Sequence, residues 1–219
     1  FAFPRGAKAG SLLHDILENL DFTEKDQSVI NKLVNGKLSE YGFDQEWQGT
    51  ISEMIAKVMA APLQPPPDGF TLSRVAQKDR LSELEFCFPL QRITPNSLRK
   101  IFIDFGGPEI PGDFSGWIQE LDFHPVKGFM KGFIDLVFQY RERFYIVDWK
   151  SNFLGNRIGD YNSKRIAREM EENFYYLQSN LYVLALHQYL KKRIRNYHYK
   201  EHFGGVFYIF LRGVDPQAG

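Results

Sequence analysis

The sequence predicts an α/β or α+β layered domain in which helices pack on a central mixed β-sheet. Three observations predict it. The first third of the chain has apolar residues at helical spacing, the middle has strand-like apolar runs, and a long helical stretch precedes a closing apolar run. Of the 219 residues, 43% are apolar and 16% aromatic, which suits a packed core rather than a disordered chain. We therefore expect a single domain over residues 1–219.

The helical N-terminal part is predicted from apolar periodicity. Leucine and isoleucine residues repeat at steps of three and four over residues 10–20, and weaker patterns predict helices over residues 25–34 and 45–59. The proline-rich residues 62–69 then break the pattern. We expect a surface loop there, separating the helices from a β-rich middle.

The remaining elements follow in order. Residues 83–90 alternate enough to predict a strand, and a short helix is expected near Pro95. From Trp117 the sequence is strand-like up to Ser151, residues 164–190 predict one long helix, and residues 204–213 predict a closing strand.

Charge and cysteine content narrow the function classes. Lys and Arg number 27, as do Asp and Glu, so the net charge is zero and any anionic partner must be met by a local patch. The single cysteine, Cys87, forms no internal disulfide, which fits a reducing compartment and a cytoplasmic location. No apolar run approaches the ~18 residues of a membrane span. The start has neither an initiator Met nor a signal peptide, so we expect a piece excised from a longer chain.

The stretch GFIDLVFQYRERFYIVDWKSN, residues 132–152, predicts an antiparallel hairpin that carries charges inside apolar runs. If it turns about Arg141 and Glu142, Asp135 faces Asp148 across the two strands. A four-residue loop over residues 140–143 is favoured, because Arg-Glu is a poor two-residue turn, and it keeps the same register.

Lys150 lies two residues beyond Asp148 and is expected on the same face. Two facing carboxylates on a half-buried sheet repel each other unless a positive group compensates them. Lys150 could neutralise one of them, and a divalent cation could neutralise both. Hard oxygen ligands favour Mg²⁺ or Mn²⁺ over zinc. The ordinary alternative, charges on a solvent-facing strand, is disfavoured because both faces of the predicted hairpin are otherwise apolar.

These residues resemble a known family. GFID followed by VDWKSN resembles the Asp…Asp-x-Lys signature of the PD-(D/E)xK nucleases, and more closely the nuclease domain at the C-terminus of RecB-type helicase-nucleases. RGAKAGSLLHDILENLDF, ELEF, YYLQSNLYVLALH and HFGGVFYIFLRGVD are similar to further segments of that domain, in the same order. The signature's leading proline is Ile134 here. The resemblance implies a restriction-endonuclease-like α/β core and an excised C-terminal part of a longer chain.

The resemblance also implies site roles. Asp135 and Asp148 would be the main metal ligands, with His14 and the backbone carbonyl of Trp149 completing the set. A lone histidine beside an apolar helical stripe is otherwise an ordinary helix residue. Lys150 would orient the attacking water and stabilise charge on the phosphate, and Glu83 would complete the site, although Glu85 also fits the pattern.

Other residues are expected to bind DNA or support the site. Gln178 and Tyr182 lie four apart on one helical face, where they would contact the DNA backbone or support Lys150. Lys127 and Lys131 are the preferred DNA contacts, with a possible second patch at Arg92, Arg99 and Lys100.

The implied activity is that of an exodeoxyribonuclease V type nuclease. It would use Mg²⁺ to hydrolyse single- and double-stranded DNA without strong sequence specificity, in double-strand-break repair, recombination and foreign DNA degradation. Mn²⁺ is a possible substitute, and Ca²⁺ is expected to occupy the site without supporting cleavage. The implied partners are RecC, RecD, the helicase domains of the same chain, and RecA. ATP would act only through those helicase domains, because no P-loop motif is present.

Two alternatives belong to other classes. A nuclease-fold module that docks RecA and is inactive in isolation would have no need of the Asp135, Asp148 and Lys150 set. A two-carboxylate glycosidase would leave Lys150 and His14 without a role.

Overall fold

The computed structural model describes residues 2–64, 69–94, 96, 100 and 126–216. Its main elements run in the order α1 (Ala7–Asn19), α2 (Gln27–Glu40), α3 (Gln48–Ala60), β1 (Arg80–Ile93), β2 (Val126–Tyr140), β3 (Arg143–Lys150), α6 (Ser163–Glu172), α7 (Tyr175–Arg193), α8 (Tyr199–His202) and β4 (Phe203–Phe210). The described strands form one sheet in the order β1-β2-β3-β4, antiparallel except for the parallel pair of β3 and β4. The expected α/β fold with a mixed sheet flanked by helices is confirmed, and it is compatible with a nuclease-like core.

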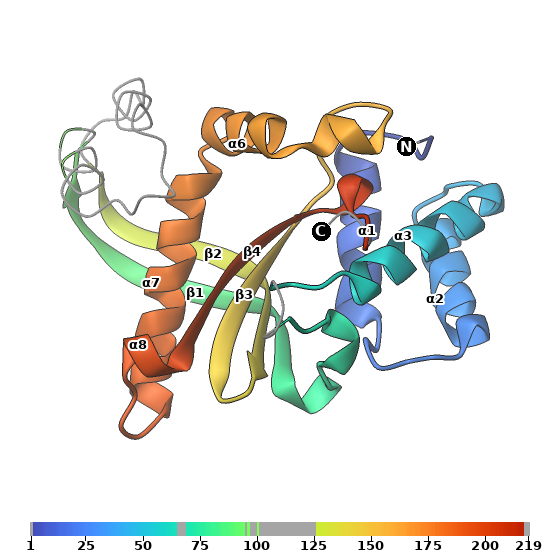
Figure 1. The fold of residues 1–219 in the computed structure, drawn as a ribbon. Helices are drawn as coiled ribbons and strands as arrows, with labels where there is room; N and C mark the ends of the chain where they lie inside the picture. Colours follow the sequence, from blue (N-terminus) through green and yellow to red (C-terminus); the bar gives the residue numbers. More distant parts are fainter. Residues whose placement is uncertain (1, 65–68, 95, 97–99, 101–125, 217–219) are drawn as a thin grey trace.

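The sheet lies between two helical layers (Figure 1). On one face, α1 to α3 enclose the larger core with the side chains of Leu136, Phe138 and Val147. On the other face, α7 packs against Ile134 and Ile146 in a second core. Both faces of β2 and β3 are therefore covered by helices.

The N-terminal helices form for local reasons. In α1, one apolar side is fully buried, at Ala9, Leu12, Leu13, Ile16 and Leu17, which is the spacing of one helical face. Helix α2 begins after Asp26, whose side chain accepts a hydrogen bond from the Ser28 N–H at 2.8 Å. The predicted helices are thus confirmed, with ends shifted by a few residues.

The hairpin between β2 and β3 turns on two residues. Arg141 and Glu142 have φ of 47° and 65°, the positive values of a tight two-residue hairpin turn. The expected four-residue loop is therefore wrong. The register itself is as predicted, since Tyr140 pairs with Arg143 and Leu136 pairs with Val147.

The long helix predicted over residues 164–190 is two helices. Helix α6 ends before Asn173, and Phe174 adopts a left-handed conformation with φ of 54° before α7 begins. A single left-handed residue reverses the handedness of the backbone and ends a helix. Apolar periodicity misses such a break because it continues across the junction.

Some expectations lie outside the described residues. They are most of the short helix predicted near Pro95 and the strand-like sequence over residues 117–125. Strand β1 is longer than predicted at both ends, and the predicted closing strand is confirmed as β4 but ends at Phe210, because Leu211–Gly213 forms a 3-10 helix. Within the described part of the chain, none of the helices has the length and apolar character needed to cross a bilayer.

Candidate metal-dependent active site

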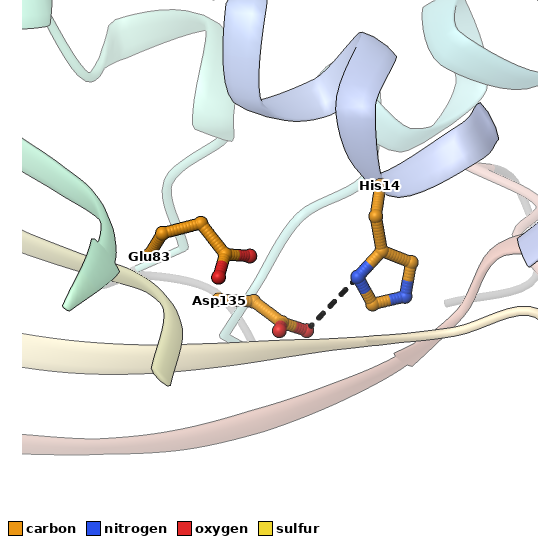
Figure 2. Close-up of side chains that lie close together, drawn as sticks. All are labelled: His14, Glu83 and Asp135. Carbon is orange, nitrogen blue, oxygen red and sulfur yellow. Dashed lines mark ion pairs between the residues drawn. The ribbon is translucent and has the colours of Figure 1, made fainter. Parts of the chain in front are cut away.

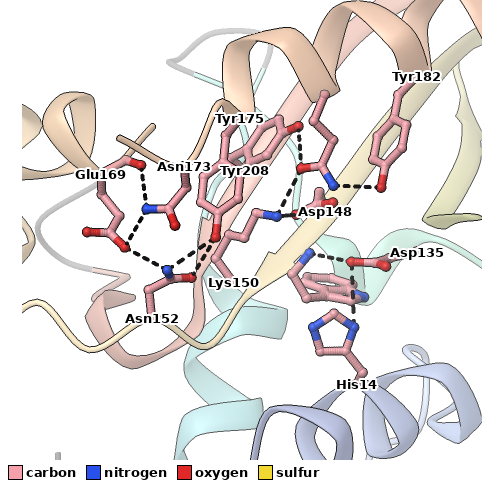
Figure 3. Close-up of polar contacts among 12 residues, drawn as sticks. His14, Asp135, Asp148, Lys150, Asn152, Glu169, Asn173, Tyr175, Tyr182 and Tyr208 are labelled. Atoms are coloured by element: carbon pink, nitrogen blue, oxygen red, sulfur yellow. Dashed lines mark hydrogen bonds and ion pairs between the residues drawn. The ribbon is translucent and has the colours of Figure 1, made fainter. Parts of the chain in front are cut away.

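Helix α1 packs close to the end of β3 one turn before His14, and so brings His14 onto the face of the sheet at the inner strand β2. A Cβ atom at Gly10 would lie 2.9 Å from the Ser151 hydroxyl oxygen, so the helix approaches the end of β3 closely there. The imidazole Nδ1 of His14 lies 3.6 Å from Oδ2 of Asp135 (Figure 3). A histidine beside an apolar helical stripe is therefore placed against the predicted carboxylate.

Asp135 sits where the pairing of β2 with β3 ends. The paired ladder reaches Leu136 and Val147 and stops one pair before Asp135 and Asp148. Instead, the carboxylate of Asp135 accepts a hydrogen bond from the backbone N–H of Trp149 at 2.8 Å. The predicted direct pairing of Asp135 with Asp148 is therefore wrong, because the ladder between β2 and β3 ends one pair earlier.

Strand β2 also changes faces at this point. Ile134 packs in the core under α7, whereas Leu136 packs in the core under α1, although a regular strand would place both on one face. Such an irregularity redirects a side chain, as bulges near active sites do. The alternation assumed from the sequence therefore fails at Asp135.

Glu83 lies opposite Asp135 in a matching irregularity of β1. Its neighbours Ser82 and Leu84 pair with Leu136 and Ile134, but Glu83 itself has φ of 51°. That left-handed conformation is uncommon and costly for a residue with a side chain, so the surrounding fold must hold it in place.

His14, Glu83 and Asp135 each offer one ligand atom, and these atoms lie within 4.8 Å of one another (Figure 2). It is the one such group of three found among the described residues. Glu85, the alternative acid, instead forms an exposed ion pair with Lys131 at 2.9 Å. The structure thus places Glu83, and not Glu85, beside Asp135.

Asp148 and Lys150 lie on the α7 side of β3. Both are buried, with 2% and 8% of their surface exposed, and Lys150 Nζ lies 2.6 Å from Oδ2 of Asp148. Trp149 between them packs in the opposite core. The spacing of two residues therefore places the carboxylate and the ammonium on one face, as expected.

A closed network of side chains surrounds Lys150 (Figure 3). Gln178 Oε1 accepts hydrogen bonds from Lys150 Nζ at 3.0 Å and from the Tyr208 hydroxyl at 3.1 Å. Gln178 Nε2 donates to the Tyr182 hydroxyl at 2.9 Å, and Tyr182 in turn hydrogen-bonds Asp148. The Lys150 ammonium also lies 3.7 Å from the centroid of the Tyr175 ring, a cation–π contact.

Burial dominates the electrostatics of the site. The pKa of Asp135 is raised to about 7, first by burial and then by the nearby Asp148 carboxylate. Burial also raises the pKa of Asp148, against the opposing effect of Lys150, and burial lowers the pKa of His14. A hydrogen bond from the imidazole to the backbone of Trp149 opposes that lowering. The ionised forms of Asp135 and Asp148 are thus disfavoured unless a further positive group compensates their charge.

These groups fit a divalent cation. Asp148 Oδ2 is buried and has no well-aligned hydrogen bond, although Lys150 is close to it. The carboxylates of Glu83 and Asp135 together with His14 provide hard oxygen donors and one nitrogen donor. The donor set is therefore a candidate site for a divalent cation.

The expected DNA contacts are only partly described. Lys131 is exposed on β2, beside Glu85, and Lys100 is exposed as well. The side chains of Arg92 and Lys127, and the whole of Arg99, lie outside the described part of the chain.

Sequence reasoning missed two residues of the Lys150 network, Tyr175 and Tyr208. Tyr208 pairs with Asp148 across the parallel strands β3 and β4, so the strand pairing decides its place. A parallel pairing of distant segments leaves no local sequence signal. The sequence pattern indicated Tyr175 only as one apolar residue of the helix predicted over residues 164–190.

Comparison with known proteins shows which proteins the chain is related to. No protein-family model matches the chain. The RecBCD enzyme subunit RecB of Escherichia coli K12 is 41% identical over 99% of this chain and 18% of its own length. Those of Haemophilus influenzae and Mycobacterium tuberculosis H37Rv are 32% identical over 99% and 97% of this chain.

The chain is homologous to a segment of RecB. The resemblance predicted from the motifs is therefore confirmed. The chain spans only about a fifth of the length of the RecB proteins that it matches.

Proposed function

We propose that this RecB homologue is one nuclease domain that hydrolyses phosphodiester bonds of single- and double-stranded DNA with the help of Mg²⁺. One observation carries the proposal. The half-buried Asp135 lies beside His14 and close enough to the buried Asp148 for the two carboxylates to repel each other, and Asp148 pairs with a buried lysine that Gln178 holds in place. A protein-docking surface needs no such buried set, and a glycosidase would use neither the lysine nor the histidine.

The proposed ligands are His14, Asp135, Asp148 and the carbonyl of Trp149, with Glu83 completing the site. The bound cation would supply Lewis-acid chemistry and neutralise charge on the phosphate. Asp135 is kept in place by the Trp149 N–H, and Asp148 by its ion pair with Lys150. These contacts hold the carboxylates before any ligand arrives, which reduces the reorganisation needed for binding.

Lys150 has the second role. With one N–H of its ammonium on Gln178 and one on Asp148, the third would donate to the attacking water, and its positive charge would stabilise charge on the phosphate. Because Lys150 is buried, this positive charge is poorly screened by water and stabilises developing negative charge strongly.

The biological setting follows from the names of the relatives, which are RecBCD enzyme subunits. We propose a role in double-strand-break repair, recombination and foreign DNA degradation, in a complex with RecC and RecD and with helicase domains that use ATP. Docking of RecA and a cytoplasmic location stay predictions. No base-reading motif was found in the sequence, so phosphate contacts would dominate binding.

The proposal is tested by incubating the chain with linear single-stranded DNA and Mg²⁺. Asp148→Asn and Lys150→Ala should each lower the cleavage rate by about a hundredfold or more, because each removes a charge that the reaction needs. EDTA should abolish cleavage, and Ca²⁺ should not restore it.

Two matched variants serve as controls. Glu53→Gln removes a surface carboxylate, and Lys57→Ala removes the surface ammonium that pairs with it. Both should cleave like the unmodified chain. If Asp148→Asn and Lys150→Ala cleaved DNA as fast as the unmodified chain, the assignment of these two residues to the active site would be refuted. Absence of cleavage by the folded, unmodified chain, together with RecA binding, would favour the docking module.

A further inference from the structure

The outer part of strand β2 exposes two phenylalanines. Phe129 is 76% exposed and Phe133 is 44% exposed, although the sequence predicts a hairpin buried on both faces. Phe129 is the most exposed of the large apolar side chains described. Single exposed apolar side chains are common, but two large aromatic rings close together on one ordered strand form a candidate binding surface.

Both phenylalanines point to the same side of the sheet. The alternate residues Met130 and Ile134 pack in the core under α7, so Phe129, Lys131 and Phe133 face the opposite side. There they form a row one residue wide, with the two rings about 13 Å apart by the rise of a strand. We call this row, Phe129–Lys131–Phe133, the aromatic strip.

The aromatic strip leads directly into the candidate metal site. Phe133 precedes Asp135 by two residues on the same strand, and its partner Glu85 on β1 follows Glu83 by two. His14 approaches Asp135 from α1, which lies on this side of the sheet (Figure 2). A ligand that extends from the metal site along β2 would therefore meet Phe133 first and Phe129 last.

A cation lies between the two rings. Lys131 Nζ is 5.6 Å from the centroid of the Phe133 ring and 2.9 Å from a carboxylate oxygen of Glu85. Both members of that ion pair are more than half exposed, and exposed pairs of this kind stabilise little. A phosphate could therefore replace Glu85 as the partner of Lys131 at low cost.

We propose that the aromatic strip is a binding track for single-stranded nucleic acid, with bases stacked on Phe129 and Phe133 and a phosphate bound by Lys131. Alternating aromatic and basic groups bind single strands without sequence preference, because every base has a face that can stack. A duplex keeps its bases stacked on each other and offers no such face. The inference rests on the proposed nuclease function, since it gives the track a substrate to lead into the site.

A protein partner is the competing occupant. Protein interfaces are broad and have an apolar centre, whereas the aromatic strip is a single row that holds a charge. The residues that pair with it on β1 are Glu85, Cys87 and Pro89, all exposed, and they add no large apolar side chain. Width and charge together favour a nucleotide chain.

The test is binding of a fluorescent oligothymidylate of about twenty nucleotides to the whole chain in EDTA, which separates binding from cleavage. Phe129→Ala and Phe133→Ala should each weaken binding about tenfold, the size of one lost stacking contact, and should change duplex binding far less. Lys131→Gln should lower the salt dependence of binding by about 0.7 in the logarithmic slope.

Substitutions that keep or remove the ring distinguish stacking from apolar docking. Trp at both phenylalanine positions should preserve binding, whereas Leu, which keeps the apolar surface, should lose it as Ala does. Leu184→Ala, at an exposed apolar residue of α7, is the matched control and should bind like the unmodified chain. All these positions are exposed, so thermal unfolding should be unchanged.

The outcomes separate the two proposals. Unchanged affinity in the Phe129→Ala/Phe133→Ala double variant, or full binding by the Leu variants, would overturn the track and leave the phenylalanines to a protein interface. So would an absence of single-strand binding by the unmodified chain. Ring-dependent binding without any cleavage in Mg²⁺ would contradict only the nuclease proposal.

Discussion

Among single residues, Gln178 has the most specific set of contacts in the site. Its carbonyl oxygen accepts from Lys150 and Tyr208, and its amide nitrogen donates to Tyr182. Every polar atom of the amide is thus committed, which fixes its orientation. Since Tyr182 also hydrogen-bonds Asp148, one side chain links the ammonium and the carboxylate of the Asp-x-Lys pair.

Replacing Gln178 by Met should separate positioning from packing. Met has a similar volume and makes no strong hydrogen bond, so Lys150 should lose its orientation while the core stays filled. We expect the turnover rate to fall by about tenfold or more with little change in KM for DNA, because the lost interaction acts on the reacting groups. Steady-state cleavage kinetics measure both quantities.

Gln188→Met, at an exposed position of the same helix, is the matched control and should leave both constants unchanged. A rise in KM alone, with a normal turnover rate, would show that Gln178 binds DNA and does not position Lys150.

Among the elements, strand β2 combines two tasks. Its inner half pairs with β3 and fills both cores, whereas its outer half, among the strands that the structure describes, pairs only with β1 and carries the aromatic strip. At the junction, Gly132 lies under the ring of Phe86, which packs against Tyr182 of α7 with ring centroids 5.9 Å apart. The strand can pass so close to the ring because Gly132 has no side chain.

Gly132→Ala should therefore destabilise the fold. A Cβ atom there would lie 2.5 Å from the Phe86 ring, and overpacking of this kind costs about 1–3 kcal/mol. Urea unfolding should show a lower midpoint with an unchanged slope.

Gly128→Ala, four residues earlier on the same strand, meets no atom within 4 Å and should leave the midpoint nearly unchanged. Phe86→Leu should relieve part of the penalty in a double variant. Equal midpoints for the two glycine variants would mean that the Phe86 ring can move aside freely.

In the whole molecule, Arg212 joins segments from both ends of the chain. Its guanidinium donates to the carbonyl oxygens of Phe3 and Pro4 and to that of Ser151, directly after β3. Ser151 lies so close to α1 that a Cβ atom at Gly10 would meet its hydroxyl group, so the same junction positions the helix that carries His14. The buried Arg212 therefore connects chain closure with the geometry of the site.

Arg212→Ala should lower the free energy of unfolding by about 1–3 kcal/mol, because it leaves buried carbonyl groups without donors. It should also lower cleavage, through loosening of α1 against the sheet. Arg195→Ala, at an exposed arginine, is the control and should change neither. Thermal unfolding and cleavage rates test this, and an unchanged melting temperature in Arg212→Ala would contradict it.

Sequence reasoning predicted the elements whose signals are local. The buried stripe of α1, the strand character of β1 to β4 and the register of the hairpin all follow from spacing along one segment. It failed at single residues with unusual backbone conformations. Phe174 splits the predicted long helix, and Arg141 and Glu142 form a turn that their residue types do not favour. Such conformations are held by packing elsewhere in the fold, so local propensity does not reveal them.

What the sequence by itself determined is the hairpin that carries the proposed site residues. Asp148 and Lys150 share a face because they are two residues apart on one strand, and no tertiary contact is needed to place them so. The tertiary structure alone decided which groups join them. The change of faces in β1 and β2 turns Glu83 and Asp135 towards His14, the parallel pairing of β4 brings Tyr208 to Lys150, and the outer half of β2 leaves its phenylalanines exposed. These outcomes depend on contacts between distant segments, because burial and strand pairing are properties of the assembled fold.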